Sequence, residues 1–167
     1  MNESTELAAL RVKANAGDAG AQCNLGLMYA NGEGVPQDYV EAVSWFRQAA
    51  DQGHAVAQNN LGSAYATGQG VPQDYVEAVS WFRQAAEQGD ANAHSNLGLM
   101  YGNGQGVPQD YVEAHKWLNL AASRASTENQ KRYAESRDAV ASFMTPQQNA
   151  DAQKLAREWL AAFEQRN

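Results

Sequence analysis

Three pairs of acidic residues form the pattern in this sequence that most resembles a catalytic site. Each pair has the spacing Asp-x-x-Glu, and paired carboxylates can act as a general acid and a general base. The pairs are Asp38 and Glu41, Asp74 and Glu77, and Asp110 and Glu113. Because one active site would not be copied three times in identical form, we interpret the pairs as helix caps. The Asp accepts a backbone N–H, and the Glu reaches back to the first residue of the cap.

Residues that often bind metals or act as nucleophiles are few and scattered. His54, His94 and His115 share no metal-ligand spacing, and no Cys-x-x-Cys occurs. Cys23 is the only cysteine. No base lies beside it in the sequence, so we expect a neutral, partly exposed thiol. We therefore predict no metal site, no cofactor and no enzymatic activity.

A repeated segment organises the chain. GVPQDYVEAVSWFRQAA at 34–50 recurs unchanged at 70–86, and a third version, GVPQDYVEAHKWLNLAA, occupies 106–122. A fixed 36-residue period indicates a repeat array, in which each unit buries its apolar face against its neighbours. We predict one domain over 1–167. It comprises an N-terminal capping helix at 1–18, repeats at 19–54, 55–90 and 91–126, and a C-terminal helical cap at 127–167.

Each repeat is predicted to contain two helices joined by a loop rich in glycine and proline. In the second repeat, helix A is expected over 55–66 and helix B over 75–88, because apolar residues recur at helical spacing in both. Gly62, like Gly26 and Gly98, lies inside helix A, where glycine is unfavourable. We interpret it as a point of close approach between helices. Trp45, Trp81 and Trp117 are interpreted as core residues.

The two ends depart from the period. We expect a helix over 4–16 capped by Ser4, and a helix over 127–144 with Tyr133, Val140 and Phe143 facing inward. A last helix starts at Thr145-Pro146 and carries Trp159 on its apolar stripe. These helices would cover the ends of the array.

The repeat resembles the Sel1-like repeat. In the first unit the matching residues are Ala21, Gln22, Leu25, Gly26, Tyr29, Gly32, Gly34, Val35, Asp38, Ala42, Trp45, Ala49, Ala50, Gln52 and Gly53. The resemblance implies an all-α fold, a right-handed α-solenoid related to tetratricopeptide repeats. It also implies a bacterial adaptor that binds other proteins.

Helix A has a face opposite Leu25 and Tyr29 that would line a concave surface. Residue types vary from repeat to repeat on this face while the core stays constant, as a binding surface permits; neutral drift of exposed positions explains the variation equally well. Three asparagines at its edge could bind a peptide backbone or a neighbouring loop. The candidate protein-binding residues are Cys23, Asn24, Leu27, Asn31, Val56, Asn59, Asn60, Ser63, Asn92, Ser95, Asn96, Leu99 and Asn103.

Charge and hydropathy narrow the range of partners. A net charge of −7 argues against nucleic acids and anionic membranes as partners. No apolar run approaches the ~18 residues of a membrane span. The segment MNESTELAAL does not resemble a secretory leader. The compartment stays open: cytoplasmic, or periplasmic or secreted if a leader has been removed. We predict an unidentified protein or peptide partner. The alternative is a structural module that forms homo-oligomers, and an enzyme or small-ligand binder is less favoured.

Overall fold

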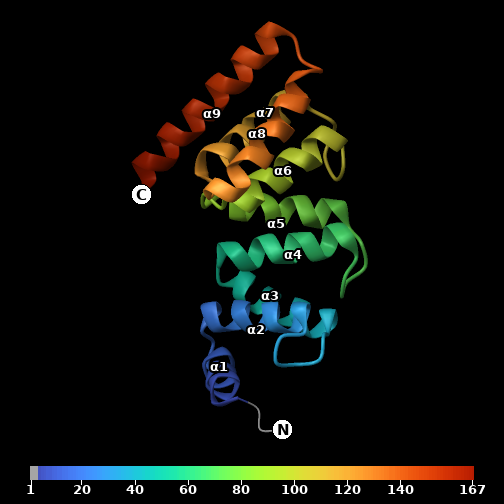
Figure 1. Ribbon diagram of the computed structural model, residues 1–167, viewed down its shortest axis with the longest axis vertical. Helices are drawn as coiled ribbons and strands as arrows, with labels where there is room; N and C mark the ends of the chain where they lie inside the picture. The colour runs from blue at the N-terminus through green and yellow to red at the C-terminus, as the bar shows by residue number, and fades with distance from the viewer. Residues whose placement is uncertain (1–3) are drawn as a thin grey trace. The chain divides into compact units, whose positions relative to one another are not determined.

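The computed structural model describes residues 4–167, which form nine α-helices and no strand (Figure 1). The prediction of an all-α solenoid fold is confirmed. The chain groups into two compact units, Met1–Trp81 and Phe82–Asn167, with the division inside one helix. Each unit is described by itself below.

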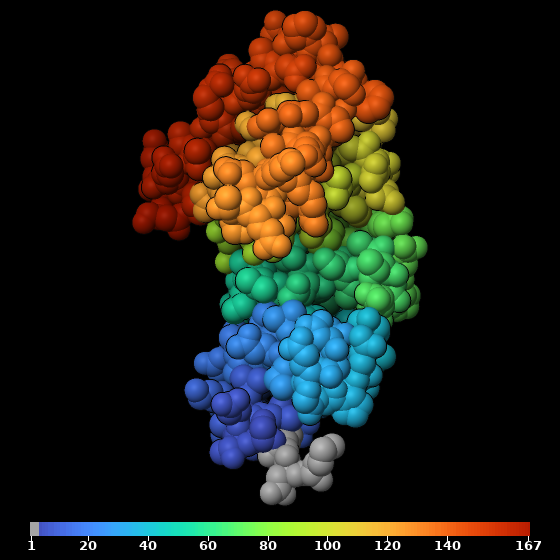
Figure 2. All heavy atoms as spheres, in the orientation of Figure 1, coloured from blue at the N-terminus to red at the C-terminus, as the bar shows by residue number. Residues whose placement is uncertain are grey.

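The helices follow the predicted order of paired helices. The first unit contains α1 (Thr5–Asn15), α2 (Ala19–Asn31), α3 (Tyr39–Asp51), α4 (Ala55–Thr67) and the first part of α5 (Tyr75–Glu87). The second contains the rest of α5, α6 (Ala91–Asn103), α7 (Tyr111–Arg124), α8 (Thr127–Ala141) and α9 (Pro146–Arg166). In the space-filling view, α8 and α9, orange to red, form the visible C-terminal surface of the second unit (Figure 2).

The acidic pairs are helix caps, but only the Asp half of the predicted capping box forms. Asp38 Oδ1 accepts hydrogen bonds from the backbone nitrogens of Val40 at 2.9 Å and Glu41 at 3.1 Å. The Asp38 N–H donates to Tyr29 O at 2.9 Å, so it is not available to Glu41. Equivalent bonds recur in the other repeats, at Asp74 and Asp110. The complete reciprocal box occurs at the start of α9.

Polar contacts that recur with the period tie each B-type helix to the A helix that follows. Arg47 Nη2 donates to Tyr65 OH at 2.7 Å, as Arg83 does to Tyr101. Arg11 in α1 makes the same contact with Tyr29 at 3.2 Å. The first helix therefore occupies the position of a helix B in register with the repeats.

Helix α2 is buried on two faces, and this corrects one part of the sequence interpretation. Leu25 and Ala21 pack with residues of α1, as predicted for the core face. Cys23 packs with α3 and α4 instead of facing solvent. Its side chain is 2% exposed, and burial raises the pKa of its thiol to about 11. The equivalent residues Asn59 and Ser95 are also buried, so none of these three lies on an open surface.

The helical glycines mark the close contacts that the sequence predicted. A methyl group built at Gly26 would lie 2.6 Å from the Phe46 ring, and one at Gly98 would lie 2.8 Å from Leu118 Cγ. Both distances are shorter than side-chain packing allows. In each case the A and B helices of one repeat can approach this closely only because the A helix lacks a side chain there.

The C-terminal helices cover the third repeat, but the predicted position of Phe143 was wrong. Trp117 is 1% exposed, and Trp159 of α9 packs edge-on against His94, with ring centroids 4.9 Å apart. Tyr133 is buried as predicted. Phe143 was expected inside, but α8 ends at Ala141, and the phenylalanine in the following turn is 69% exposed.

His94 takes the place of a glutamine that anchors the other repeats. Gln22 and Gln58 donate from Nε2 to the carbonyl oxygens of Ala14 and Ala50, at 3.1 and 3.2 Å. The imidazole of His94 makes the same bond from Nε2 to Ala86 O at 2.8 Å. Burial lowers the pKa of His94 to about 4, and the nearby charges of Arg124 and Lys116 add to this shift.

Replacing Gly26 with alanine should lower the free energy of unfolding by about 2 kcal/mol, because the new methyl group overpacks the helix contact. Gly20 in the same helix is the matched control, since a methyl group there would meet only Asp18 Oδ1, at 3.4 Å. Gly20→Ala should be neutral or slightly stabilising. Urea unfolding of both variants tests the close approach, and equal effects would contradict it.

Replacing His94 with the repeat glutamine should reduce the loss of stability in acid. The folded-state pKa of His94 lies below the ordinary 6.5, so the unfolded chain binds more protons as pH falls from 6.5 toward 4. Between pH 6.5 and pH 4 this difference should lower the free energy of unfolding of the natural protein by about 3 kcal/mol. His94→Gln should not show this loss, because glutamine does not titrate. Unfolding curves at several pH values measure the difference. Parallel pH dependence of the two proteins would show that the imidazole protonates freely in the fold.

Candidate functional site

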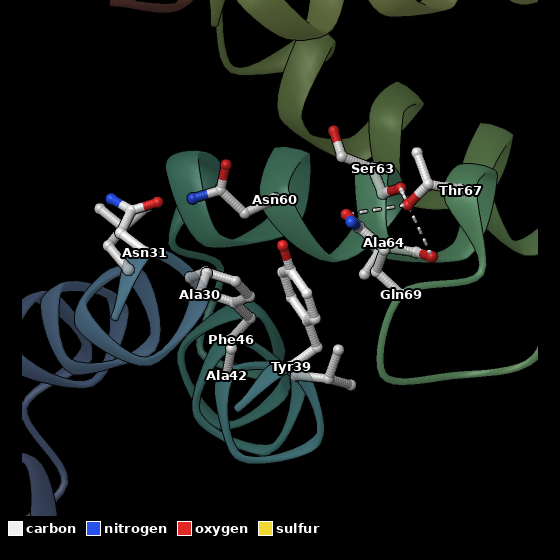
Figure 3. Close-up of a pocket in the computed structure, with 12 residues that line it drawn as sticks. Ala30, Asn31, Tyr39, Ala42, Phe46, Asn60, Ser63, Ala64, Thr67 and Gln69 are labelled. Atoms are coloured by element: carbon white, nitrogen blue, oxygen red, sulfur yellow. Dashed lines mark hydrogen bonds between the residues drawn. The ribbon is translucent and has the colours of Figure 1, made fainter. Parts of the chain in front are cut away.

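A groove in the first unit lies between α2 and α4, with α3 as its floor (Figure 3). We call it the first-repeat groove; its volume is about 300 Å³. Tyr39 and Phe46 rise from α3 between the two flanking helices. Its lining residues are Leu27, Ala30 and Asn31 from α2, Tyr39, Ala42, Val43 and Phe46 from α3, Asn60, Ser63, Ala64 and Thr67 from α4, and Gln69.

Helical spacing explains why these residues share the groove. Asn60, Ser63 and Thr67 follow i, i+3 and i+7 on α4, and therefore lie on one face of that helix. Leu27 and Asn31 are one turn apart on α2. Residues of the floor recur at the same spacing along α3, which places an apolar stripe beside the mostly polar face of α4.

The groove lining contains no Asp, Glu, Lys, Arg or His. Its polar groups are amides and hydroxyls, some of which are already hydrogen-bonded. Thr67 Oγ1 donates to Ser63 O at 2.9 Å, and Asn31 Nδ2 donates to Glu33 at 3.1 Å. Asn60 Nδ2 is buried and has no hydrogen-bond partner among residues 4–167. An uncharged groove lined by amides and hydroxyls is suited to neutral groups such as the peptide backbone and apolar side chains.

Four predicted candidates meet in this groove: Leu27, Asn31, Asn60 and Ser63. Leu27 is half-buried because it also packs against the core between α3 and α4. Two other candidates do not line the groove, although Asn24 is exposed and Val56 is 44% exposed. The burial of Leu25, Leu61 and Leu97, each 0% exposed, is confirmed.

The second unit contains an equivalent groove in the third repeat, with a volume of about 390 Å³. Leu99, Asn103 and Tyr111 line it, in the register of Leu27, Asn31 and Tyr39. The end of α8 also lines it, and Phe143 stacks on Tyr111 with ring centroids 5.4 Å apart and planes inclined by 16°. We call this the third-repeat groove.

The remaining candidates of the second unit are engaged within the fold. Asn92 Oδ1 accepts a hydrogen bond from Tyr133 OH at 2.6 Å, and Asn96 is partly buried. Among residues 4–167, no three His, Cys, Asp or Glu side chains are grouped so that they could hold a metal ion. In the same range, no helix combines the length and the apolar character needed to cross a bilayer.

Sequence reasoning missed the floor of the groove. Tyr39 is the same in all three repeats, and Phe46 is replaced only by Leu118 in the third, so both resembled core residues. Variation between repeats was the signal used to find candidates, and it detects poorly a nearly constant residue whose neighbours change. The signal that could have found them is the helical face shared by Tyr39, Val43 and Phe46, at i, i+4 and i+7.

Comparison with known proteins places these features in a family. The Sel1 repeat model matches residues 19–54, 55–90 and 91–126, the three repeats read from the sequence. A search of curated proteins found no match.

Two solved structures are similar to the chain. One is a protective antigen present in uropathogenic Escherichia coli strains that displays an SLR fold. It is 36% identical with a TM-score of 0.86, and the match covers 97% of this chain and 34% of the antigen. The chain thus spans about a third of that protein's length. The other is a Sel1 repeat protein from Oxalobacter formigenes, 38% identical with a TM-score of 0.67, matched over 78% of this chain and 98% of that one. The chain belongs to the Sel1 repeat family.

Proposed function

We propose that this protein is a binding scaffold whose first-repeat groove holds an extended segment of a protein partner. An apolar side chain of the segment packs on Tyr39 and Phe46, and its backbone bonds to the amides of Asn31 and Asn60. The observation that carries the proposal is the convergence of three variable positions, Leu27, Asn31 and Ser63, and the constant Asn60 on one uncharged groove. Sel1 repeats generally form protein-interaction scaffolds, and this supports the same class of function.

The third-repeat groove supports an aromatic side chain as the anchor. There the chain's own Phe143 stacks on Tyr111, the residue equivalent to Tyr39. In the first-repeat groove, Tyr39 lies between α2 and α4 with no such ring against it in the first unit. Offset-stacked rings contribute about 0.5–1.5 kcal/mol beyond the area they bury. A partner that supplies a phenylalanine or tyrosine would reproduce the contact that the fold already makes.

The chemistry of the groove favours binding over catalysis. Its lining has no Asp, Glu, His, Lys or Cys to act as a general acid or base or to activate the hydroxyls of Ser63 and Thr67. Cys23 is buried outside the groove with a raised thiol pKa. A volume of about 300 Å³ accommodates one large side chain and its flanking backbone.

Selection of a random peptide display library against the protein should enrich sequences with an aromatic anchor. Ser63→Arg should weaken the selected peptides by at least about tenfold, because a long charged side chain then fills the groove from α4. Fluorescence anisotropy with labelled peptides measures the change in Kd. Failure to enrich any peptide, or enrichment without aromatic residues, would count against the proposed anchor.

Asn24→Arg is the matched control for this test. It introduces the same charge on the neighbouring helix α2, at an exposed position outside the groove. It should change Kd by less than about twofold, since surface substitutions away from a site have small effects. Circular dichroism of both variants checks that the helices are retained. If both variants weaken peptide binding equally, the peptide binds outside the groove, or the added positive charge weakens binding wherever it is placed.

A further inference from the structure

One buried position breaks the repeat pattern with a polar residue. Four helices in register place Leu7, Val43, Val79 and His115 at the same site, and their exposed fractions are 4%, 6%, 5% and 4%. Three of the four are aliphatic, and the fourth is an imidazole of the second unit. Equal burial shows that the structure did not open to bring the histidine to the surface.

His115 is not stabilised by the fold that buries it. Nδ1 is enclosed and has no hydrogen-bond partner within residues 4–167. Burial lowers the pKa of His115, the positive charge of Arg137 lowers it further, and Asp138 opposes the shift, so the ring is neutral at pH 7. A buried polar group without a partner costs about 1–3 kcal/mol, which the repeat valine would avoid.

A polar cavity of about 470 Å³ lies directly against this histidine. It lies between α7, α8 and α9, all of the second unit, and is open to solvent at α9, where Gln153 and Arg157 are exposed. Its volume falls within the roughly 300–1,000 Å³ typical of small-molecule sites. The lining residues are His115 and Asn119 from α7, Arg137, Asp138 and Ala141 from α8, and Asn149, Gln153 and Arg157 from α9. We call it the C-terminal cavity.

The charges in the C-terminal cavity are only partly balanced. Arg137 donates from Nε and Nη2 to Asp138 Oδ1, at 3.0 and 2.9 Å, and from Nη1 to Asn119 at 3.0 Å. The single carboxylate of the lining is thus paired. Arg157 has no ion pair with any carboxylate of residues 4–167, and Gln153 adds an amide donor beside it on α9. The cavity therefore has one guanidinium and several N–H donors in excess of its acceptors.

We propose that the C-terminal cavity binds a carboxylate group, held by the guanidinium of Arg157 and hydrogen-bonded to the imidazole of His115. A guanidinium pairs with a carboxylate through two parallel N–H···O bonds, which is stronger than a contact between neutral groups. Because Nδ1 is enclosed, the contact falls to the other ring nitrogen, and neutral His115 can donate its Nε2–H to the carboxylate. The amides of Gln153 and Asn149 can complete the coordination of its oxygens.

This site is independent of the first-repeat groove, which belongs to the other unit and contains no charge. Two sources could supply the carboxylate: a small organic acid, or the C-terminus of a peptide. They share the same headgroup chemistry but differ in the chain attached to it. The experiment therefore uses succinate as one probe. The other is an N-acetylated tripeptide with a free C-terminal carboxylate, compared with its C-terminal amide.

The probes are titrated into the full chain while the side-chain amide resonances of Gln153 and Asn149 are followed by NMR. At least one probe should shift these resonances and saturate with a Kd on the order of millimolar or tighter. Arg157→Gln should weaken that probe by at least about tenfold. Lys154→Gln on the same helix is the control, because it removes an equal charge outside the cavity, at a side chain that is 69% exposed and pairs with Glu158. It should leave Kd unchanged within about twofold.

His115→Val tests the histidine separately. It restores the residue found at 43 and 79, so the variant should fold, melt at a higher temperature and bind the probe several-fold more weakly. Binding of the free carboxylate tripeptide but not succinate or the amide would identify a peptide terminus as the source, and binding of succinate would identify a small acid. The proposal is overturned if no probe binds up to about 20 mM, or if Arg157→Gln and Lys154→Gln weaken binding equally.

Discussion

Each A helix of this protein must be covered on two sides, and most of the structure follows from that requirement. Helix α2 packs Leu25 against α1 and Cys23 against α3 and α4. A helix buried on two faces cannot carry large side chains everywhere, so Gly26 faces Phe46, with room for no more than a hydrogen atom. The requirement also explains why the A helices α2, α4 and α6 contain many small residues and show no single strong apolar stripe.

Burial on two sides demands that polar groups between the helices be satisfied. Gln22 and Gln58 meet this need by donating to carbonyl oxygens in the last turn of the preceding B-type helix. The arginine–tyrosine contacts, such as Arg47 with Tyr65, add a second polar link at the edge of the same interface. Each of these bonds joins one helix to the next, so the same bond forms wherever the same pair of helices recurs. The geometry of each interface therefore depends only on the two helices that form it.

Many residues that differ from the repeat pattern lie where the third repeat meets the C-terminal cap. In the second unit α8 and α9 take the place of a further repeat, and they meet residues of the third repeat that differ from its predecessors. Trp159 covers His94, Phe143 stacks on Tyr111, and the polar residues of α8 and α9 face His115. An internal repeat must pack against a repeat on each side, so its sequence is restricted. A capping segment packs against a repeat on one side only, so it can form contacts and cavities that an internal repeat cannot.

The sequence by itself determined the helix order, the loops, the glycine contacts and the burial of Leu25, Leu61 and Leu97, because these depend on local spacing repeated three times. It did not reveal that Cys23 is buried, since helical spacing indicates which residues share a face but not how many faces are covered. The floor of the first-repeat groove and the cavity that His115 shares with Arg157 were equally hidden. Each is lined by residues of different helices, and only the tertiary structure decides which helix faces meet.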